Sequence, residues 1–311
     1  MRIGVFGSAG FIGINLLLKL KDLPDVKIHA FDTNLEYFPR FLNSIENITL
    51  NECAYHKDSC YDNMILNYDY VFDLISTNTP RTSNNDIYKE LHCGIAPNLR
   101  LIDACCRNRV KRFIFISSGG AIYGPTKECP IKEDTVANPI STYGLQKLMI
   151  EKLLYIYKNT NNLDYKIIRL SNPYGPFQRP NGKLGVVTTF IDRAIKKEHI
   201  KILGDGSTIR DYIYIDDAIN AILNVSFNNS IYSTYNIGSG VGISIKELVN
   251  EISNELNESL IIDRCPENKC DVPMNILDTS RYEKEFGAIQ KTSLRSGIKQ
   301  TASFLEKCNI S

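Results

Sequence analysis

The most evident absence in this 311-residue chain is an excess of charge of either sign. Lys and Arg number 36 against 35 Asp and Glu, the formal net charge is +1, and there are no charge blocks, repeats or low-complexity tracts. Proteins that bind nucleic acid or an anionic membrane usually carry a basic face, so the sequence predicts neither partner. The length and the 43% of hydrophobic residues suit an ordinary globular protein of one large or two smaller domains.

Cysteine spacing typical of metal sites is also missing. The nine cysteines contain no C-x-x-C pair, and the close pairs Cys105/Cys106 and Cys265/Cys270 lack histidine partners for zinc, so no metal is expected. The odd number and the lack of a signal peptide predict reduced thiols in the cytoplasm. The N-terminal apolar run IGVFGSAGFIGINLLL contains four glycines, which favours a strand, a turn and a helix over a membrane span.

Short apolar runs alternate with helical patterns up to about residue 171. Six runs are predicted to be strands, at residues 2–7, 27–32, 48–53, 70–76, 112–118 and 165–171. They are apolar along nearly their whole length, as expected of strands that are covered on both faces. Residues 94–109 and 143–158 show helical patterns. This alternation predicts an α/β fold, with a Rossmann-like doubly wound parallel sheet in residues 1–171.

The sequence changes character after residue 171. Residues 172–185 contain three prolines and three glycines and are predicted to form a structured loop. Ser244 and Glu247 have the spacing of a capping box, which predicts a helix over residues 244–256. Residues 172–311 are therefore predicted to form a smaller C-terminal lobe, with some segments that return to the sheet.

A glycine-rich turn follows the first predicted strand. Gly7 permits a tight turn, Gly10 lets backbone N–H groups approach a pyrophosphate, and Gly13 allows close packing of helix and strand. Phe11 and Ile12 belong to the same candidate cofactor site. Asp32 closes the second strand, where a carboxylate accepts hydrogen bonds from the adenosine ribose and repels a 2′-phosphate. The pattern predicts NAD(H) rather than NADP(H) as cofactor.

A candidate acid–base pair lies at the start of the long helix over residues 143–158. Tyr143 and Lys147 are four residues apart, on one helix face. An ammonium beside a phenol stabilises the phenolate and lowers its pKa, which makes the tyrosine a usable base near neutral pH. A Y-x-x-x-K pair is common on exposed helices, but this one follows the fifth strand of a dinucleotide-binding pattern.

In these motifs the chain resembles the extended short-chain dehydrogenases/reductases, and within them the NAD-dependent nucleotide-sugar epimerases and dehydratases. The matching segments are GSAGFIG, Asp32, SSGGAIYG, YGLQK, RLSNPYGP, GDGSTIRDYIYIDD and YNIGSG. The last three lie in the second lobe, and SNPYGPFQRP with ISTYG is most similar to the UDP-glucose 4-epimerase-like branch. The resemblance implies a nucleotide-sugar-binding second lobe, and a homodimer built on the helix that carries Tyr143.

The resemblance also implies a reaction and the residues that perform it. Ser118, Tyr143 and Lys147 form the catalytic set: Tyr143 takes the proton of the sugar O4 hydroxyl while NAD+ takes hydride from C4, and Lys147 also contacts the nicotinamide ribose. The 4-keto sugar turns over, and hydride returns to its other face. Ser118 hydrogen-bonds O4 and is expected rather than Ser117, because it is the third residue after Phe113–Phe115 and neighbouring strand residues face opposite sides.

In the second lobe the resemblance implies three substrate-binding residues. Asn172 contacts the sugar diphosphate, Arg210 clamps it as a planar fork, and Asp271 accepts hydrogen bonds from the nucleotide ribose. The alternative for Arg210 is a surface ion pair with Asp211 or Asp205.

Several positions depart from the family pattern. The acidic residue that approaches adenine falls at Ala54 or Tyr55, and a helix-opening Asn falls at Gly94. The Lys that the family often has just after the fourth strand is absent, and Arg81 is the nearest basic residue. The phosphate-binding Arg of the family falls at Asn268, beside Lys269. These changes leave the nucleotide base open. Asn275 falls where a bulky residue blocks N-acetyl groups in the family, so it leaves room for an N-acetylhexosamine.

Two activities share the Ser/Tyr/Lys set. The leading hypothesis is an NAD-dependent nucleotide-sugar 4-epimerase acting on a UDP-hexose or UDP-N-acetylhexosamine, for surface polysaccharide or sugar-nucleotide biosynthesis. The alternative is a reductase of nucleotide-4-keto-6-deoxyhexoses, which consumes the reduced cofactor. A dehydratase is disfavoured because it needs an acid and a base after the catalytic hydroxyl, where this chain has Gly119 and Gly120.

Overall fold

The computed structural model describes residues 1–310 apart from 57–58, 77–82, 181–184 and 267–271. Its centre is a seven-stranded parallel sheet in the order β10-β6-β5-β4-β1-β2-β3. The seven strands are β1 (Arg2–Phe6), β2 (Lys27–Asp32), β3 (Ile48–Glu52), β4 (Tyr70–Asp73), β5 (Arg112–Ser118), β6 (Tyr165–Leu170) and β10 (Thr234–Ile237). All six strands predicted from the sequence are present, and the doubly wound α/β fold is confirmed.

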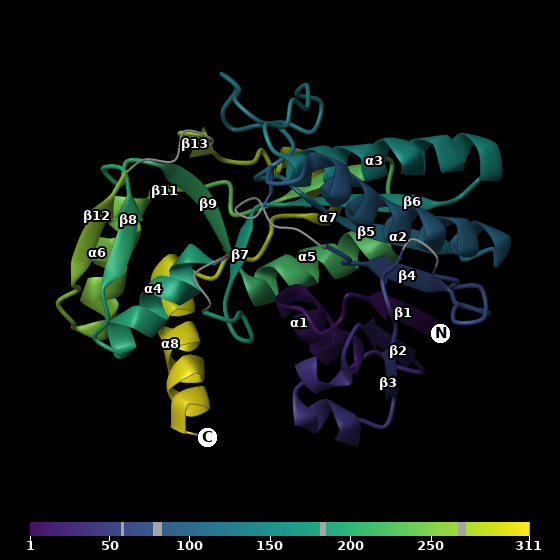
Figure 1. Cartoon of the computed structure of the whole chain (residues 1–311), viewed down its shortest axis with the longest axis horizontal. Coiled ribbons are helices and arrows are strands. Elements are labelled where there is room, and N and C mark those ends of the chain that lie inside the picture. The colour runs from purple at the N-terminus through teal and green to yellow at the C-terminus, as the bar shows by residue number, and fades with distance from the viewer. Residues whose placement is uncertain (57–58, 77–82, 181–184, 267–271, 311) are drawn as a thin grey trace.

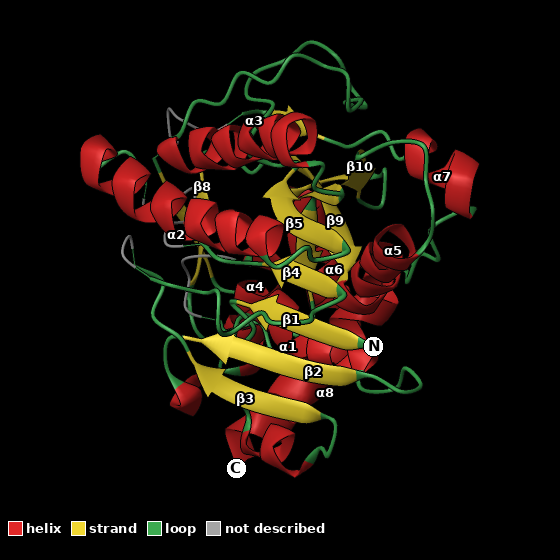
Figure 2. Cartoon of the chain, turned by 90° about the vertical axis from the view of Figure 1, so that its right-hand side faces the viewer, coloured by secondary structure: helices red, strands yellow, loops and turns green. Residues whose placement is uncertain are grey.

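Helices cover both faces of this sheet, which explains why its strands are apolar throughout (Figures 1 and 2). The helices α2 (Ile87–Arg107) and α3 (Thr142–Asn161) pack against each other on one face, and α1 (Phe11–Leu20) and α5 (Ile215–Phe227) pack against each other on the other. Each face has its own cluster of buried side chains, and the cluster on the α1 and α5 side continues into the second lobe.

The second lobe is built around smaller sheets (Figure 1). In one, β9 (Ile209–Tyr214) pairs with β7 (Asn172–Tyr174), β11 (Gly242–Ser244) and β13 (Met274–Asn275). In the other, β8 (Ile200–Leu203) pairs with β12 (Ile262–Cys265). The remaining elements are α4 (Val186–Ile195), α6 (Ile245–Leu256), α7 (Ser280–Phe286), α8 (Leu294–Ile310) and the short η1 (Leu35–Tyr37) and η2 (Arg40–Ser44).

Residues after 171 also return to the large sheet. The strand β10 pairs with β6 at the sheet edge, and α5 covers one sheet face, so two elements of the C-terminal part complete the N-terminal architecture. The division of the chain at residue 171 stays a prediction.

Two sequence-based boundaries were wrong. The helix predicted over residues 94–109 begins earlier, because the Asp86 side chain accepts the N–H of Lys89 and starts α2 at Ile87. Gly94 therefore lies inside α2, where a side chain would collide with Gln146 of α3. The loop predicted over residues 172–185 opens with a strand, β7, because its backbone pairs with β9. The capping box at Ser244 and Glu247 is present and starts α6.

The topology creates a crevice above the carboxyl ends of the central strands. The chain runs from β1 through β2 to β3 on one side, and then crosses to β4 on the other side of β1. In a doubly wound sheet, ligands bind at such a reversal of strand order. The glycine-rich turn after β1 and the serines that end β5 both lie at this edge.

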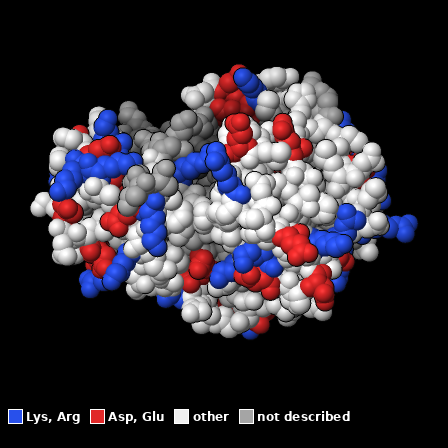
Figure 3. Space-filling model, turned by 90° about the horizontal axis from the view of Figure 1, so that it is seen from below, with Lys and Arg blue, Asp and Glu red and all other residues white. Residues whose placement is uncertain are grey.

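The surface agrees with the balanced composition. On the face shown in Figure 3, basic and acidic side chains are interspersed among neutral ones. None of the helices in the described part of the chain is long and apolar enough to cross a membrane. Within the same residues, no group of three or more His, Cys, Asp and Glu side chains is arranged to hold a metal ion.

Candidate active site

A cleft of about 900 Å³ lies over the carboxyl ends of the strands and extends to the second lobe. Every candidate site residue in the described part of the chain lines it, from both parts of the protein. These residues are Gly7, Gly10, Phe11, Ile12, Gly13, Asp32, Ser118, Tyr143, Lys147, Asn172 and Arg210. Asp271, with Asn268, Lys269 and Arg81, lies outside the described residues.

The glycine-rich turn has the shape that a dinucleotide phosphate requires. Gly7 has a φ of +77°, and a Cβ there would lie 2.9 Å from the backbone of Leu74. A Cβ on Gly13 would lie 2.5 Å from the backbone of Ser8, so only glycine lets α1 pack this closely against the turn. The N-terminus of α1 has no side-chain cap and no acidic residue in its first turn. Its backbone N–H groups therefore suit an anion such as the NAD diphosphate.

Asp32 is held at the end of β2 by the turn that it faces. One carboxylate oxygen accepts the N–H of Ala9 at 2.8 Å, and the other accepts the N–H of Thr33 at 2.7 Å. The side chain is largely buried and lines the cleft. These bonds fix a carboxylate beside the glycine-rich turn, where the remaining lone pairs suit ribose hydroxyls.

Tyr55, one of the two positions at which the acidic residue of the family pattern was expected, also lies in this part of the cleft. Its hydroxyl accepts the N–H of Gly7 at 2.6 Å and donates to the carbonyl of Phe31 at 2.6 Å. Burial, followed by the nearby Asp32 charge, raises the pKa of Tyr55, so the phenol stays neutral. The Tyr55 hydroxyl thus joins the glycine-rich turn to the end of β2.

The two serines at the end of β5 face different neighbours. The Ser118 side chain lines the cleft together with Tyr143, and its presence lowers the pKa of the Tyr143 phenol. The Ser117 hydroxyl instead donates to Glu151 at 2.6 Å, and Glu151 is paired with the buried Arg169 at 2.6 Å. The Ser117 hydroxyl is thus engaged by Glu151, and the assignment of Ser118 as the catalytic hydroxyl stays a prediction.

Burial dominates the chemistry of the candidate pair on α3. It raises the pKa of Tyr143, while the hydrogen bond with Ser118 lowers it. Burial also lowers the pKa of Lys147 to about 8, against the raising effect of Asp73 and Glu151. The Lys147 Nζ atom donates to the carbonyl oxygens of Ile116 at 2.9 Å and Ile75 at 3.4 Å. The effect of Lys147 on the pKa of Tyr143 stays a prediction.

The second-lobe side of the cleft is assembled from separate strands. Asn172 on β7 donates its amide to the carbonyl of Asp211 at 2.9 Å. Arg210 on β9 donates to the carbonyl of Ile209 and lines the cleft. Of its two alternative partners, Asp211 accepts from Ser239, Gly240 and Leu277, and Asp205 lies 3.7 Å from Lys246. The diphosphate contact of Arg210 stays a prediction.

Gly119 and Gly120 form the turn after Ser118. A Cβ on Gly119 would lie 2.5 Å from the buried Leu277 side chain, so a larger residue there would require Leu277 to move. Gly120 lines the cleft beside Asn172. Asn275 is buried, and its amide donates to the carbonyl of Gly119 at 3.1 Å. This turn presents no carboxylate to the cleft.

Other cleft residues were not identified from the sequence. Among them are Tyr37, Leu74, Ile75, Ser76, Ser171, Arg179, Val187 and Tyr212. Several of them directly follow the carboxyl ends of β4 and β6, at the edge of the sheet where the crevice lies. This position in the chain is the sequence signal that could have identified them. Arg179 had no such signal, and it lies at the cleft because its guanidinium packs over the Tyr37 ring at 5.4 Å and donates to the Tyr37 carbonyl.

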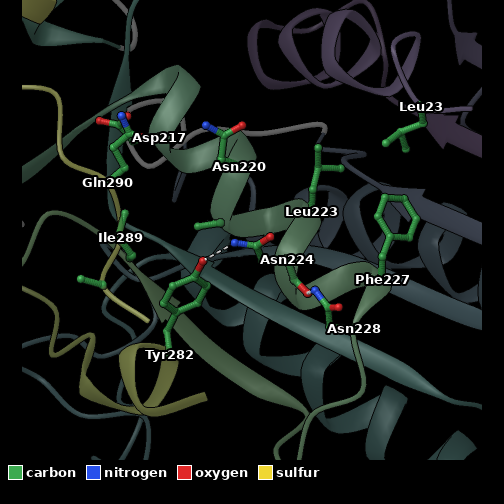
Figure 4. A pocket seen from close by; sticks show the side chains of 12 residues that line it. Leu23, Asp217, Asn220, Leu223, Asn224, Phe227, Asn228, Tyr282, Ile289 and Gln290 are labelled. Carbon is green, nitrogen blue, oxygen red and sulfur yellow. Dashed lines mark hydrogen bonds between the residues drawn. The ribbon is translucent and has the colours of Figure 1, made fainter. Parts of the chain in front are cut away.

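A second hollow of about 540 Å³ lies between α5, α7 and the segment that follows α7 (Figure 4). The amide of Asn224 donates to the Tyr282 hydroxyl at 2.9 Å, and Asp217 accepts from Thr292 at 2.6 Å. These polar groups are thus already paired within the chain. None of the candidate site residues lines this hollow.

Comparison with known proteins finds a family model and relatives that match most of the chain. A family model described as the NAD dependent epimerase/dehydratase family matches residues 3–238. The chain is 30% identical to the UDP-glucose 4-epimerase of Mycolicibacterium smegmatis, over 98% of each protein. It is also 30% identical to a dTDP-4-dehydro-6-deoxyglucose reductase of Escherichia coli, over 94% of each.

The fold has a close counterpart among solved structures. The UDP-glucose 4-epimerase of Thermotoga maritima, solved with UDP-glucose, superposes with a TM-score of 0.90 at 30% identity, over 99% of this chain and 100% of that one. The similarity therefore includes the second lobe as well as the sheet.

Proposed function

Because the chain belongs to the NAD-dependent epimerase/dehydratase family, within the extended short-chain dehydrogenases/reductases, we propose that it is a nucleotide-sugar 4-epimerase. Its proposed substrates are a UDP-hexose or a UDP-N-acetylhexosamine. The proposal is supported by the epimerase relatives and by the arrangement of Ser118, Tyr143 and Lys147 at the base of the cleft. NAD is the cofactor of the family, and the glycine-rich turn and Asp32 fit its diphosphate and its ribose.

One observation carries the proposal. Ser118, Tyr143 and Lys147 line the same cleft, and the residue that follows Ser118 there is Gly120 rather than an acid. Among the described residues, no carboxylate directly follows Ser118, where elimination at a neighbouring carbon would need a second acid–base pair. This supports reversible oxidation of a single carbinol, which is the chemistry of C4 epimerisation.

The residues divide the proposed reaction among them. Tyr143 removes the proton of the O4 hydroxyl and later returns it, and Ser118 donates a hydrogen bond to O4. Lys147 places a positive charge beneath the pair and favours the phenolate. Asn172 and Arg210 hold the diphosphate, so that the sugar turns while the nucleotide stays anchored. When bound, NAD+ supplies a reversible hydride acceptor for C4.

Purified protein provides the test. It should interconvert UDP-glucose and UDP-galactose, or their N-acetyl forms, without net change at the nicotinamide absorbance band, because the cofactor is regenerated in each turnover. Proton NMR of the anomeric signals follows the interconversion, and Tyr143→Phe serves as the inactive control. Absence of any interconversion in all four sugars would remove the UDP-hexose assignment.

A second candidate is a nucleotide-4-keto-6-deoxyhexose reductase, favoured by the relative that is a dTDP-4-dehydro-6-deoxyglucose reductase. The same serine, tyrosine and lysine would deliver a proton to O4 of the keto sugar. In that case the protein consumes the reduced cofactor in proportion to product, and a falling nicotinamide absorbance with a 4-keto-6-deoxy sugar separates the two activities.

We further propose a homodimer, a cytoplasmic location and a role in surface polysaccharide or sugar-nucleotide biosynthesis. The dimer is supported by apolar side chains that stay exposed on α2 and α3, among them Tyr88, Leu145, Met149 and Ile156. Burial of such side chains against a second copy is favourable. Sedimentation velocity should give twice the chain mass, and Met149→Glu with Ile156→Glu should shift the protein toward monomer.

A further inference from the structure

A carboxyl group is buried at the end of a strand that is otherwise apolar. Asp73, the last residue of β4, has no exposed surface and lies in register with Phe6 on β1 and Phe115 on β5. Strand alternation places it on the same sheet face as Val71 and Ile75, under α2 and α3. A carboxylate in such a place is costly unless a partner compensates its charge.

Hydrogen bonding satisfies only part of this carboxyl group. One oxygen accepts the backbone N–H of Ile75 at 3.0 Å. The other oxygen is buried and has no hydrogen-bond partner among the described residues. Most of the compensation for a charged Asp73 must therefore come from a nearby cation.

Lys147 supplies that cation, and Ile75 connects the two side chains. The carbonyl of Ile75, whose N–H is bonded to Asp73, accepts from the Lys147 ammonium at 3.4 Å. The same ammonium lies 4.7 Å from the centre of the Phe115 ring, the cross-strand neighbour of Asp73. Lys147 is itself only 5% exposed, so each charge is desolvated and each acts on the other.

The other titratable groups around the pair are engaged or neutral. Glu151, one turn after Lys147 on α3, is paired with Arg169 at 2.6 Å. Cys105 on α2 and Tyr61 also face Asp73, and burial raises the pKa of both, so they stay protonated. In the described part of the chain, Asp73 is therefore the carboxylate near Lys147 that is not already paired with another cation.

We propose that Asp73 is a positioning residue for Lys147. Its charge keeps the buried ammonium protonated, and its hydrogen bond to Ile75 holds the carbonyl that receives the ammonium. The proposal rests on the proposed function only in treating Lys147 as part of the reacting set. Burial lowers the pKa of Lys147 and raises that of Asp73, so without Asp73 the lysine would lose its proton at a lower pH.

Asp73→Asn tests the charge while an amide oxygen still accepts from Ile75. We expect turnover within about threefold of wild type near pH 6, where Asp73 is already largely protonated. We expect the alkaline fall in activity to begin about one pH unit lower, so that turnover at pH 8 to 9 drops about tenfold. The pH profile of kcat for the variant and for wild type is the measurement.

Glu133→Gln is the matched control, since Glu133 is also a buried acid but lies 3.5 Å from Arg281, away from the cleft. It should lower stability without moving the alkaline limb. A loss in Asp73→Asn that is the same at every pH would overturn the proposal, because it would indicate a purely structural role.

A second measurement does not depend on activity. Urea unfolding of the full chain at pH 8 is compared for Asp73→Asn, Lys147→Met and the double variant. Each single change leaves one buried charge without its partner, so both should lower the urea midpoint, and the double variant should recover part of the loss. Additive effects would overturn the proposal even if the protein proves not to be an epimerase. If Asp73→Asn alone does not fold, the double variant should still do so, and its failure would count against the pairing.

Discussion

The two sides of the cleft are built in different ways. The side over β1 and β2 is formed by consecutive residues, from Gly7 to Gly13, whose backbone follows one tight turn into one helix. The side toward the second lobe is formed by single side chains, such as Asn172 on β7 and Arg210 on β9. The first kind of site needs positions without a Cβ, and the second needs particular functional groups.

This difference predicts how each side responds to mutation. On the turn side, a substitution acts through backbone position, so even one added methyl group moves the donors of the site. On the second-lobe side, a substitution acts through charge and reach, and the backbone stays in place. Tyr143 and Ser118 lie between the two sides, and their proposed role is proton transfer rather than ligand binding. The largest effects on turnover are therefore expected there.

Tyr143→Phe should give the largest effect. The ring remains, but the group that exchanges a proton with the substrate is lost, and general acid–base catalysis of this kind is worth about 10²–10⁴-fold. We expect kcat to fall about a thousandfold, while the dissociation constant of NAD stays within about threefold of wild type. Steady-state kinetics and cofactor fluorescence measure the two quantities. Near-normal turnover would exclude Tyr143 as the acid–base group.

Ser118→Ala and Ser117→Ala should differ although the residues are neighbours. Ser118 lines the cleft with Tyr143, and loss of a hydrogen-bond donor to a reacting oxygen costs about a hundredfold in kcat. The Ser117 hydroxyl donates to Glu151 instead, so its loss should cost about 1 kcal/mol of stability and leave kcat within about threefold. Thermal unfolding and kcat of both variants check this, and the reverse order would reassign the catalytic serine.

The turn side of the cleft could be predicted closely from the sequence. Gly7, Gly10 and Gly13 are close together in the chain, and their spacing alone reports a strand, a turn and a helix that approach one another. The strands were predictable for a related reason, since a strand buried on both faces must be apolar throughout. Asp32 followed from its place at the end of such a strand.

Other features depend on contacts between distant segments, and the sequence does not reveal them locally. The start of α2 at Ile87 lies outside the apolar periodicity, because its first turn is exposed and is fixed by the Asp86 cap. β7 forms only because β9 pairs with it. Asp73 interrupts an apolar strand, which was a visible signal, but its relation to Lys147 required the packing of α3 on the sheet.

Gly13→Ala tests the turn side alone. The added Cβ would lie 2.5 Å from the Ser8 backbone, so α1 must move and its N–H groups move with it. We expect NAD to bind about thirtyfold more weakly, equivalent to about 2 kcal/mol, with the affinity for nucleotide sugar little changed. Gly4→Ala is the matched control, because a Cβ there lies no closer than 3.3 Å to any side chain. Equal NAD binding by both variants would show that the turn tolerates displacement.

Arg210→Lys tests the second-lobe side and should have the smallest effect. Lysine keeps the positive charge at the cleft wall but replaces the planar fork by a point charge, so paired bonds to a diphosphate are lost. We expect KM for the nucleotide sugar to rise about fivefold to tenfold, equivalent to about 1.0–1.4 kcal/mol, with kcat and NAD affinity almost unchanged. This is less than the about 1.5–3 kcal/mol of a whole charge-assisted hydrogen bond, because lysine keeps the positive charge. Arg210→Leu should raise KM further, because the charge is lost as well. If both variants kept the wild-type KM, the diphosphate contact would have to be assigned to another side chain at this wall, of which Arg179 is the nearest candidate in chemistry.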